Sequence, residues 1–222
     1  MTDKYNPVFT YYMITFCSLV FITNFFLPTP VILHFLSNFA LIPSTFYTGK
    51  HYLALLTYQF IHLNFQHLIS NMFVLFAIGR AIESETGTMK FGASYIGAGI
   101  GSGVLHVFFN QSSETMVIGA SGAIFGAIAI LLLLMPFRFT SAMIVPVPGV
   151  VLGITMLVVE VISILFGNDT WIAHDIHLYG FLFGGIASFS IDYNKALRGL
   201  IISVVILLGL YYWAFYIEGV LI

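Results

Sequence analysis

Hydrophobic residues gather in seven long runs along the chain, and polar residues are concentrated between them. The runs cover approximately residues 9–27, 63–79, 91–109, 117–135, 142–166, 171–191 and 200–217. About 20 apolar residues in a helix cross the hydrocarbon core of a bilayer, which is about 30 Å thick. The pattern therefore predicts an all-α, polytopic membrane bundle of seven helices, forming a single integral membrane domain over residues 1–222.

One long segment, 28–62, interrupts this series. It contains Pro28, Pro30 and Pro43 among aromatic and moderately apolar residues, and proline ends or kinks a helix. We predict that this segment is a loop that lies partly in the membrane interface. Loops of this length in compact domains are usually functional.

The composition agrees with a membrane location. Of the 222 residues, 59% are hydrophobic and only 7% are charged, and the mean hydropathy is +1.01; soluble domains are about 25% charged. The net charge is −2 and no basic run occurs, so nothing indicates nucleic-acid binding. Cys17 is the one cysteine, which excludes an intrachain disulfide. The composition carries no signal for the oligomeric state.

The distribution of positive charge predicts the orientation in the membrane. Cytoplasmic loops carry an excess of lysine and arginine. With a cytoplasmic N-terminus, six of the seven positive residues lie on that side, namely Lys4, Arg80, Lys90, Arg138, Lys195 and Arg198. Lys50 alone lies outside. We therefore predict a multi-pass protein of the cell membrane, with its C-terminus outside after seven spans and Trp171 anchored in the outer interface.

Three of the apolar runs begin with polar or glycine-rich sets. The second has His62, Asn64, Gln66, His67 and Asn71, the fourth has Gly119-Ala120-Ser121-Gly122, and the sixth has His174, Asp175 and His177. Polar groups in a spanning helix are costly and usually functional. At 1.5 Å per residue, Ser121 lies about 25 Å above Arg138, His67 about 20 Å above Arg80 and His177 about 27 Å above Lys195. All three sets fall in the outer half of the membrane, so we expect them to form one site.

These residue types indicate acyl-transfer chemistry. A serine hydroxyl becomes a nucleophile when a base such as histidine takes its proton, and the developing oxyanion needs hydrogen-bond donors. Ser121 and His177 are residues of these two types. His67 and Asn71 lie four residues apart on one helix face, and with the free backbone N–H of Ser121 at a helix start they could bind the oxyanion. Asp175 is two residues from His177 and faces away, so we expect a dyad without an acid.

Small residues give a reason for the two helices to approach closely. Gly122 and Gly126 share one helix face, and Gly180 and Gly184 share another. Faces of the small-xxx-small type let two helix backbones pack tightly in a membrane. This packing is expected to bring Ser121 within hydrogen-bond reach of His177.

Several polar residues have two interpretations each. Taken alone, Ser121 could be a packing residue and His177 a satisfied interior histidine. His62 could stabilise the loop or lie near the substrate, and His174 could touch substrate or water or lie in the interface. Glu160, in the fifth run, could hydrogen-bond a neighbouring helix or line the substrate gate or water path. His106 is interpreted as structural.

Three motifs, taken together, resemble the rhomboid family of intramembrane serine proteases. They are His62-x4-His67-x3-Asn71, then Gly119-Ala120-Ser121-Gly122, and finally Ala173-His174-x2-His177-x2-Gly180-x3-Gly184. The resemblance extends over residues 49–192. It implies a rhomboid-like six-helix core over approximately 9–192, with one additional C-terminal helix at approximately 200–217.

The resemblance also implies roles for individual residues. Ser121 would be the nucleophile and His177 the general base, and His67, Asn71 and the Ser121 amide would form the oxyanion hole. The supporting residues would be His62, Gly119, Gly122, Phe125, His174, Gly180 and Gly184. Family members cleave single-span membrane proteins near the outer face, often after a small residue, without metal or cofactor.

The chain departs from the family pattern at two places. Leu53-Ala54 stands where many members have a Trp-Arg pair in the first outer loop, and Phe125 stands where some bacterial members have tyrosine. A phenylalanine ring can still pack on the catalytic histidine. Glu83 matches an acidic position that looks structural in the family.

Two alternatives to a protease come from other functional classes. A catalytically silent relative would bind or escort membrane proteins, but such relatives typically lack the serine or the histidine, and this chain has both. A small transporter would also contain buried His, Glu and Gly residues. Transporters commonly contain an internal repeat, and the sequence has none.

Overall fold

The computed structural model describes residues 5–142, 145–167 and 173–217, and each predicted apolar run corresponds to a helix within these ranges. The helices are α1 (Val8–Phe25), α5 (Phe65–Thr86), α6 (Thr88–Phe109), α7 (Ser121–Leu134), α8 (Gly149–Phe166), α9 (His174–Ile191) and α10 (Tyr193–Tyr212), the last continued by a π-helical turn, Trp213–Ile217. By length and composition, α1, α5, α6, α8 and α10 can each cross a membrane. The predicted all-α polytopic bundle is confirmed.

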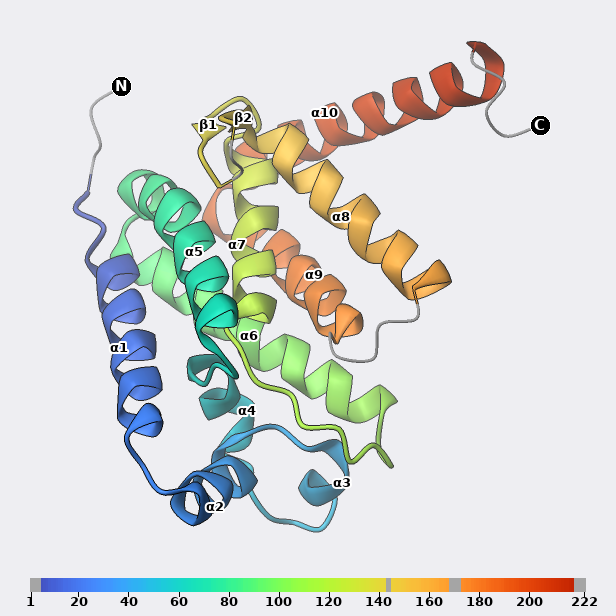
Figure 1. The fold of residues 1–222 in the computed structure, drawn as a ribbon. Coiled ribbons are helices and arrows are strands. Elements are labelled where there is room, and N and C mark those ends of the chain that lie inside the picture. The colour runs from blue at the N-terminus through green and yellow to red at the C-terminus, as the bar shows by residue number, and fades with distance from the viewer. Residues whose placement is uncertain (1–4, 143–144, 168–172, 218–222) are drawn as a thin grey trace.

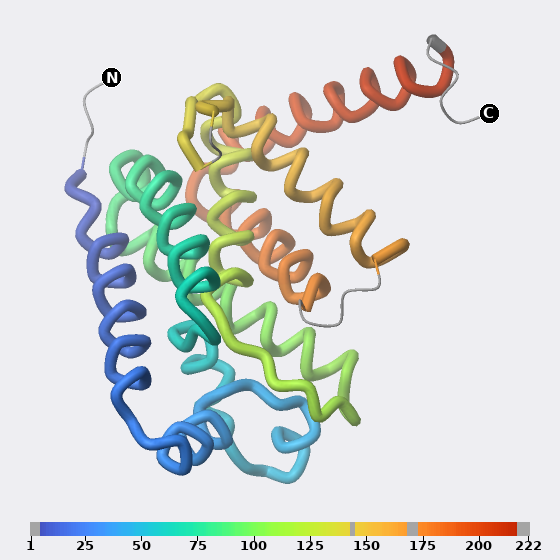
Figure 2. The backbone as a smooth tube through the Cα atoms, in the orientation of Figure 1, coloured from blue at the N-terminus to red at the C-terminus, as the bar shows by residue number. Residues whose placement is uncertain are grey.

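Helix α7 lies at the centre of the bundle (Figure 1). Every residue from Gly122 to Leu134 is buried, and α5, α6, α8, α9 and the first half of α10 pack around it. The smooth trace in Figure 2 shows the same arrangement. Fourteen residues rise only about 21 Å, less than the roughly 30 Å of a hydrocarbon core. Because α7 is this short, we expect its first residue, Ser121, to lie below one face of the membrane.

The segment 28–62 contains short helices as well as loops. They are α2 (Thr29–Phe39), α3 (Pro43–Phe46), α4 (Ala54–Thr57) and a 3₁₀ turn, Tyr58–Phe60. Pro30 and Pro43 lie in the first turns of α2 and α3, where the missing N–H of proline costs nothing. The expectation of a plain loop was therefore incomplete, although each of these helices is too short to span a bilayer.

Two element boundaries differ from the prediction because backbone pairing replaces helix. The fourth run begins as an extended segment, with Val117 paired to Leu41, and the helix starts only at Ser121. The fifth helix begins at Gly149 and not at 142, because β1 (Phe139–Thr140) pairs antiparallel with β2 (Val147–Pro148). Pro148 adopts an extended conformation immediately before the helix.

Two further helices are longer than their apolar runs. Helix α5 continues past residue 79 to Thr86, and its last turns hold the buried Glu83. Glu83 accepts hydrogen bonds from the backbone N–H groups of Phe9 and Thr10 and from two threonine hydroxyls, those of Thr10 and Thr88. Its structural role is therefore confirmed, since it joins α1 to the end of α5. Helix α10 begins at Tyr193 because Asp192 caps it, accepting from the N–H of Lys195.

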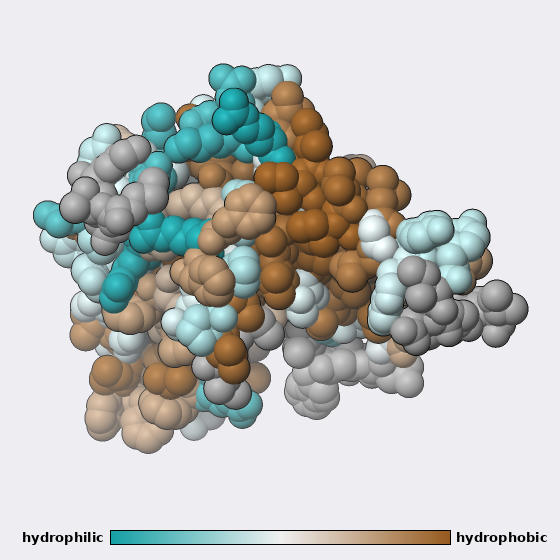
Figure 3. Space-filling view, turned by 90° about the horizontal axis from the view of Figure 1, so that it is seen from above, coloured by the Kyte–Doolittle hydropathy of each residue, from teal (hydrophilic) through white to brown (hydrophobic). Residues whose placement is uncertain are grey.

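The outer surface of the bundle is largely apolar, as expected for contact with lipid. Viewed from above, hydrophobic residues form a broad continuous area next to a hydrophilic band (Figure 3). Helix α10 packs through Ala196, Gly199 and Ser203 in its first half. Its second half is mostly exposed and leads away from the bundle (Figure 1). The side of the membrane on which the C-terminus lies stays a prediction, and Lys4 and Trp171 lie outside the described residues.

Candidate active site

Ser121 and His177 come together at one end of the bundle. Ser121 is the first residue of α7 and His177 lies in the first turns of α9. The Oγ atom of Ser121 lies 2.8 Å from Nε2 of His177, a hydrogen-bond distance. Both side chains are partly buried. The structure thus places in direct contact the two residues that the sequence predicts as nucleophile and base.

Glycines bring α7 and α9 close enough for this contact. A Cβ atom on Gly180 would collide with the backbone carbonyl of Gly122, and one on Gly184 would collide with that of Gly126. The two small-xxx-small faces therefore pack directly on each other, as the spacing predicts. No side chain other than hydrogen fits at Gly180 or Gly184 without moving a backbone.

The imidazole of His177 is held on three sides. The ring of Phe125 stacks on it, with ring centroids 4.3 Å apart and an interplanar angle of 5°. On the side opposite to Ser121, Nδ1 of His177 lies 2.9 Å from Oε1 of Glu160. The expectation that no acid contacts the dyad was therefore wrong. The acid comes from α8, and Asp175 indeed faces elsewhere.

Glu160 also contacts a second histidine. Its Oε2 atom lies 2.6 Å from Nδ1 of His174, so each carboxylate oxygen has one imidazole partner. The hydrogen bond to a neighbouring helix, one of the two interpretations of Glu160, is what the structure contains. Glu160 is only 6% exposed, and a buried carboxylate needs such partners because its desolvation is costly.

Glu160, His174 and His177 have metal-ligand atoms within 4.8 Å of one another. Two ligand atoms around a tetrahedral zinc ion are about 3.3 Å apart, given zinc–nitrogen bonds of about 2.0 Å. The 2.6 Å between Glu160 and His174 is shorter and matches a direct hydrogen bond. The cluster is therefore a hydrogen-bonded one.

The candidate oxyanion residues lie beside the dyad. Asn71 and Ser121 both line a cavity of about 160 Å³ between α5, α7 and α8. One amide hydrogen of Asn71 is used inside its own helix, since Nδ2 donates to the carbonyl of His67, 2.9 Å away. The ring of His67 lies over Gly119, where a Cβ atom would come 2.6 Å from Nε2. Gly119 also has a φ of 122°, which glycine tolerates best.

His62 lies behind His67 in the same group. The two rings meet edge to face, with centroids 5.1 Å apart. His62 is 6% exposed, and neither ring nitrogen has a hydrogen-bond partner among the described residues. Burial, with His67 as a further cause, lowers the pKa of His62 to about 4, so the ring is neutral at pH 7. Both interpretations of His62, a loop-stabilising hydrogen bond and a place near substrate, stay predictions.

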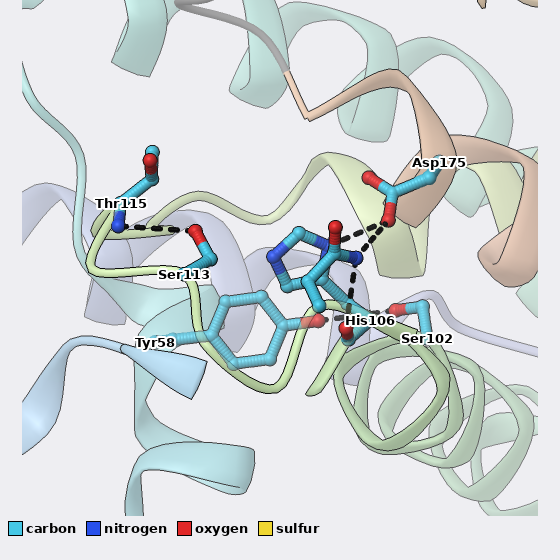
Figure 4. Close-up of polar contacts among 7 residues, drawn as sticks. Tyr58, Ser102, His106, Ser113, Thr115 and Asp175 are labelled. Atoms are coloured by element: carbon cyan, nitrogen blue, oxygen red, sulfur yellow. Dashed lines mark hydrogen bonds and ion pairs between the residues drawn. The ribbon is translucent and has the colours of Figure 1, made fainter. Parts of the chain in front are cut away.

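A second polar cluster holds the start of α9 against α6 (Figure 4). Oδ2 of Asp175 lies 2.7 Å from Nδ1 of His106 and accepts from Nδ2 of Asn110 at 3.0 Å. His106 is 6% exposed, and its structural interpretation is confirmed. Because Asp175 lies two residues before His177, the cluster fixes the segment of α9 that carries His177.

We expect Asp175→Ala to destabilise the fold by about 1–3 kcal/mol, because it removes the carboxylate that His106 and Asn110 both contact, and His106 is buried. Thermal unfolding of the purified protein in detergent measures the effect. Asp175→Asn, which keeps an acceptor oxygen, should lose less. An Asp175→Ala protein as stable as wild type would show that the cluster does not stabilise α9.

Of the pair Leu53-Ala54, which stands where many family members have Trp-Arg, one residue is exposed and the other is buried. Leu53 is 67% exposed and Ala54 is 2% exposed. The residue that sequence reasoning assigned incompletely is Glu160, for which the available signal was a lone carboxylate inside an apolar run.

Several known proteins are similar in sequence to this chain. A family profile described as Rhomboid domain matches residues 49–194, about two thirds of the chain. RHOMBOID-like protein 5 of Arabidopsis thaliana is 38% identical over 72 residues, which cover 32% of this chain and 23% of that protein. RHOMBOID-like protein 12, mitochondrial, of the same plant is 28% identical over 170 residues, covering 68% and 50% respectively.

A fungal relative gives a similar result. Rhomboid protein 1, mitochondrial, of Saccharomyces cerevisiae is 26% identical over 119 residues, covering 52% of this chain and 34% of the yeast protein. The chain thus spans half or less of the length of these three curated relatives. The profile match includes α5, α7 and α9, which carry the site. With its apolar helices and this match, the chain is a multi-pass membrane protein that belongs to the rhomboid family of intramembrane proteases.

Proposed function

We propose that this protein is a serine endopeptidase that cleaves transmembrane proteins within the bilayer. The observation that carries the proposal is the 2.8 Å contact between Oγ of Ser121 and Nε2 of His177, beside a cavity that both Ser121 and Asn71 line. A silent relative would need neither the contact nor the cavity. The single domain over residues 1–222 and the location in the cell membrane are part of the same proposal.

The chemistry follows the usual course of serine catalysis. Nε2 of His177 takes the hydroxyl proton of Ser121 as Oγ attacks the scissile carbonyl carbon. The carbonyl oxygen becomes an oxyanion, for which His67, Asn71 and the Ser121 N–H are the candidate donors. His177 then gives its proton to the leaving amine, and the peptide C–N bond breaks. Water attacks the acyl-enzyme with His177 again as base, which releases the acid and restores Ser121.

The depth of the site supports a membrane substrate. Ser121 lies below the membrane face because α7 is short, and the cavity beside it is lined by α5, α7 and α8, with apolar side chains such as Val74, Ile128 and Met156. A substrate helix must unwind locally to present a carbonyl there, since helical peptide bonds are shielded by their own hydrogen bonds. Substrates with weak helix formers near the outer boundary should therefore be preferred.

Reconstituted protein tests the proposal directly. The purified chain is incubated in liposomes with a panel of single-span proteins, and the products are mapped by mass spectrometry. We expect one discrete cut near the outer boundary, which disappears when the enzyme has first been blocked with a fluorophosphonate. Absence of cleavage across the panel together with absence of fluorophosphonate labelling would favour the silent relative.

A further inference from the structure

Glu160 is the one charged residue in α8 (Gly149–Phe166), and it faces the catalytic dyad. A carboxylate exposed to lipid or buried alone is unfavourable. Here both oxygens are partnered, Oε1 with His177 at 2.9 Å and Oε2 with His174 at 2.6 Å. The contacts come from a different helix, 17 residues away from His177 along the chain.

Glu160 contacts Nδ1 of His177, and this contact determines which ring nitrogen carries the proton. An ionised carboxylate only accepts hydrogen bonds, so His177 donates to it through Nδ1–H. The other ring nitrogen, Nε2, is then unprotonated and points at the Ser121 hydroxyl, 2.8 Å away. This is the tautomer that a general base requires. The same contact orients the ring, and Phe125 fixes its plane.

We propose that Glu160 is a positioning residue that, with Ser121 and His177, forms a triad across α7, α8 and α9. When Nε2 takes the serine proton, the ring becomes an imidazolium, and the carboxylate opposite stabilises that positive charge. Glu160 keeps no proton, and the one taken by His177 passes to the leaving amine. This inference rests on the proposed protease function and adds a third residue to its site.

His174 completes the arrangement by holding the carboxylate itself. Its Nδ1–H donates to Oε2, which prevents the carboxylate from rotating away from His177. The two histidine rings meet edge to face, with centroids 6.1 Å apart, and their side chains are 15% and 12% exposed. His174 therefore acts on the site through Glu160. A direct contact with substrate is not needed to give it a function.

Fluorophosphonate labelling tests the proposal because it reports nucleophilicity without substrate binding. We expect Glu160→Gln to lower the labelling rate of Ser121 and kcat for cleavage by about 10- to 100-fold, with KM changed by less than about twofold. Glutamine keeps the size of the side chain but presents an N–H₂ group to one ring. Glu160→Asp, which keeps the charge, should recover part of the rate, and His174→Ala should lose less than Glu160→Gln.

Controls separate this role from a purely structural one and from failure of the protease proposal. Val159→Ala changes an exposed neighbour on α8, 47% exposed, and should label at the wild-type rate. A Glu160→Gln protein that labels and cleaves as fast as wild type would overturn the triad, as would an equal loss in Val159→Ala. A wild-type protein that is not labelled at Ser121 would instead overturn the protease proposal itself.

Discussion

The Ser121→Ala protein is expected to lose fluorophosphonate labelling completely and to retain less than about 10⁻⁴ of the wild-type kcat. The physical reason is that alanine has no atom to form the acyl bond. In a well-studied serine protease, loss of the nucleophile costs about 10⁶-fold in kcat. Cleavage of a reconstituted single-span substrate, followed over time by gel or mass spectrometry, measures the effect. Ser112, exposed in the connection before α7, provides the matched control, since Ser112→Ala should cleave at the wild-type rate.

A double variant that also changes His177 makes this test more specific, because nucleophile and base act as a unit. If the 2.8 Å contact is the catalytic one, the Ser121→Ala/His177→Ala double variant should be no less active than either single variant. If the loss of kcat in the double variant were the product of the two single losses, the two residues would act independently. Substantial cleavage by Ser121→Ala would show that another residue supplies the nucleophile.

The helices and the meeting of Ser121 with His177 could be predicted from the sequence because both depend on regular geometry. Apolar runs of about 20 residues specify spans, and a fixed rise per residue gives each polar group a depth. Glycines four apart indicate where two helices touch. In the structure, Gly122 and Gly126 indeed pack on Gly180 and Gly184.

The contact of Glu160 with the dyad could not be predicted in this way. Glu160 lies in the fifth apolar run, but its position in the run does not say which way that face of the helix points. That direction depends on how α8 is rotated about its axis. The only sequence signal was that a charge in an apolar helix must face protein or water.

The predicted helix boundaries were wrong where polar contacts, and not hydrophobicity, decide where a helix begins or ends. Helix α5 extends beyond its apolar run because Glu83 accepts hydrogen bonds from α1 and from Thr88. Helix α10 begins early because Asp192 caps it, a signal that the apolar pattern does not contain. Helix α8 begins late because Val147 and Pro148 are paired in a short antiparallel ladder.

The packing of α7 on α9 makes an opposite pair of predictions for two glycines. A Cβ atom on Gly184 would lie 2.5 Å from the C and Cα atoms of Gly126. These are backbone atoms of a buried helix and cannot rotate away, so the two helices must separate. Gly97, in α6, has no atom within 4 Å of its Cβ position, and it is exposed. A change from glycine to alanine therefore collides with backbone atoms at Gly184 and meets no neighbouring atom at Gly97.

We therefore expect Gly184→Ala to destabilise the protein by about 3 kcal/mol, the upper part of the range for overpacked cores. It should also lower kcat sharply, because separation of α7 from α9 moves Ser121 away from His177. Gly97→Ala should instead leave activity unchanged and stabilise the fold by about 0.5–1 kcal/mol, since alanine favours a helix over glycine. Thermal unfolding in detergent, measured for both variants beside the cleavage rate, tests the pair. If Gly184→Ala were as stable and active as Gly97→Ala, the close contact of α7 and α9 would not be what holds the dyad together.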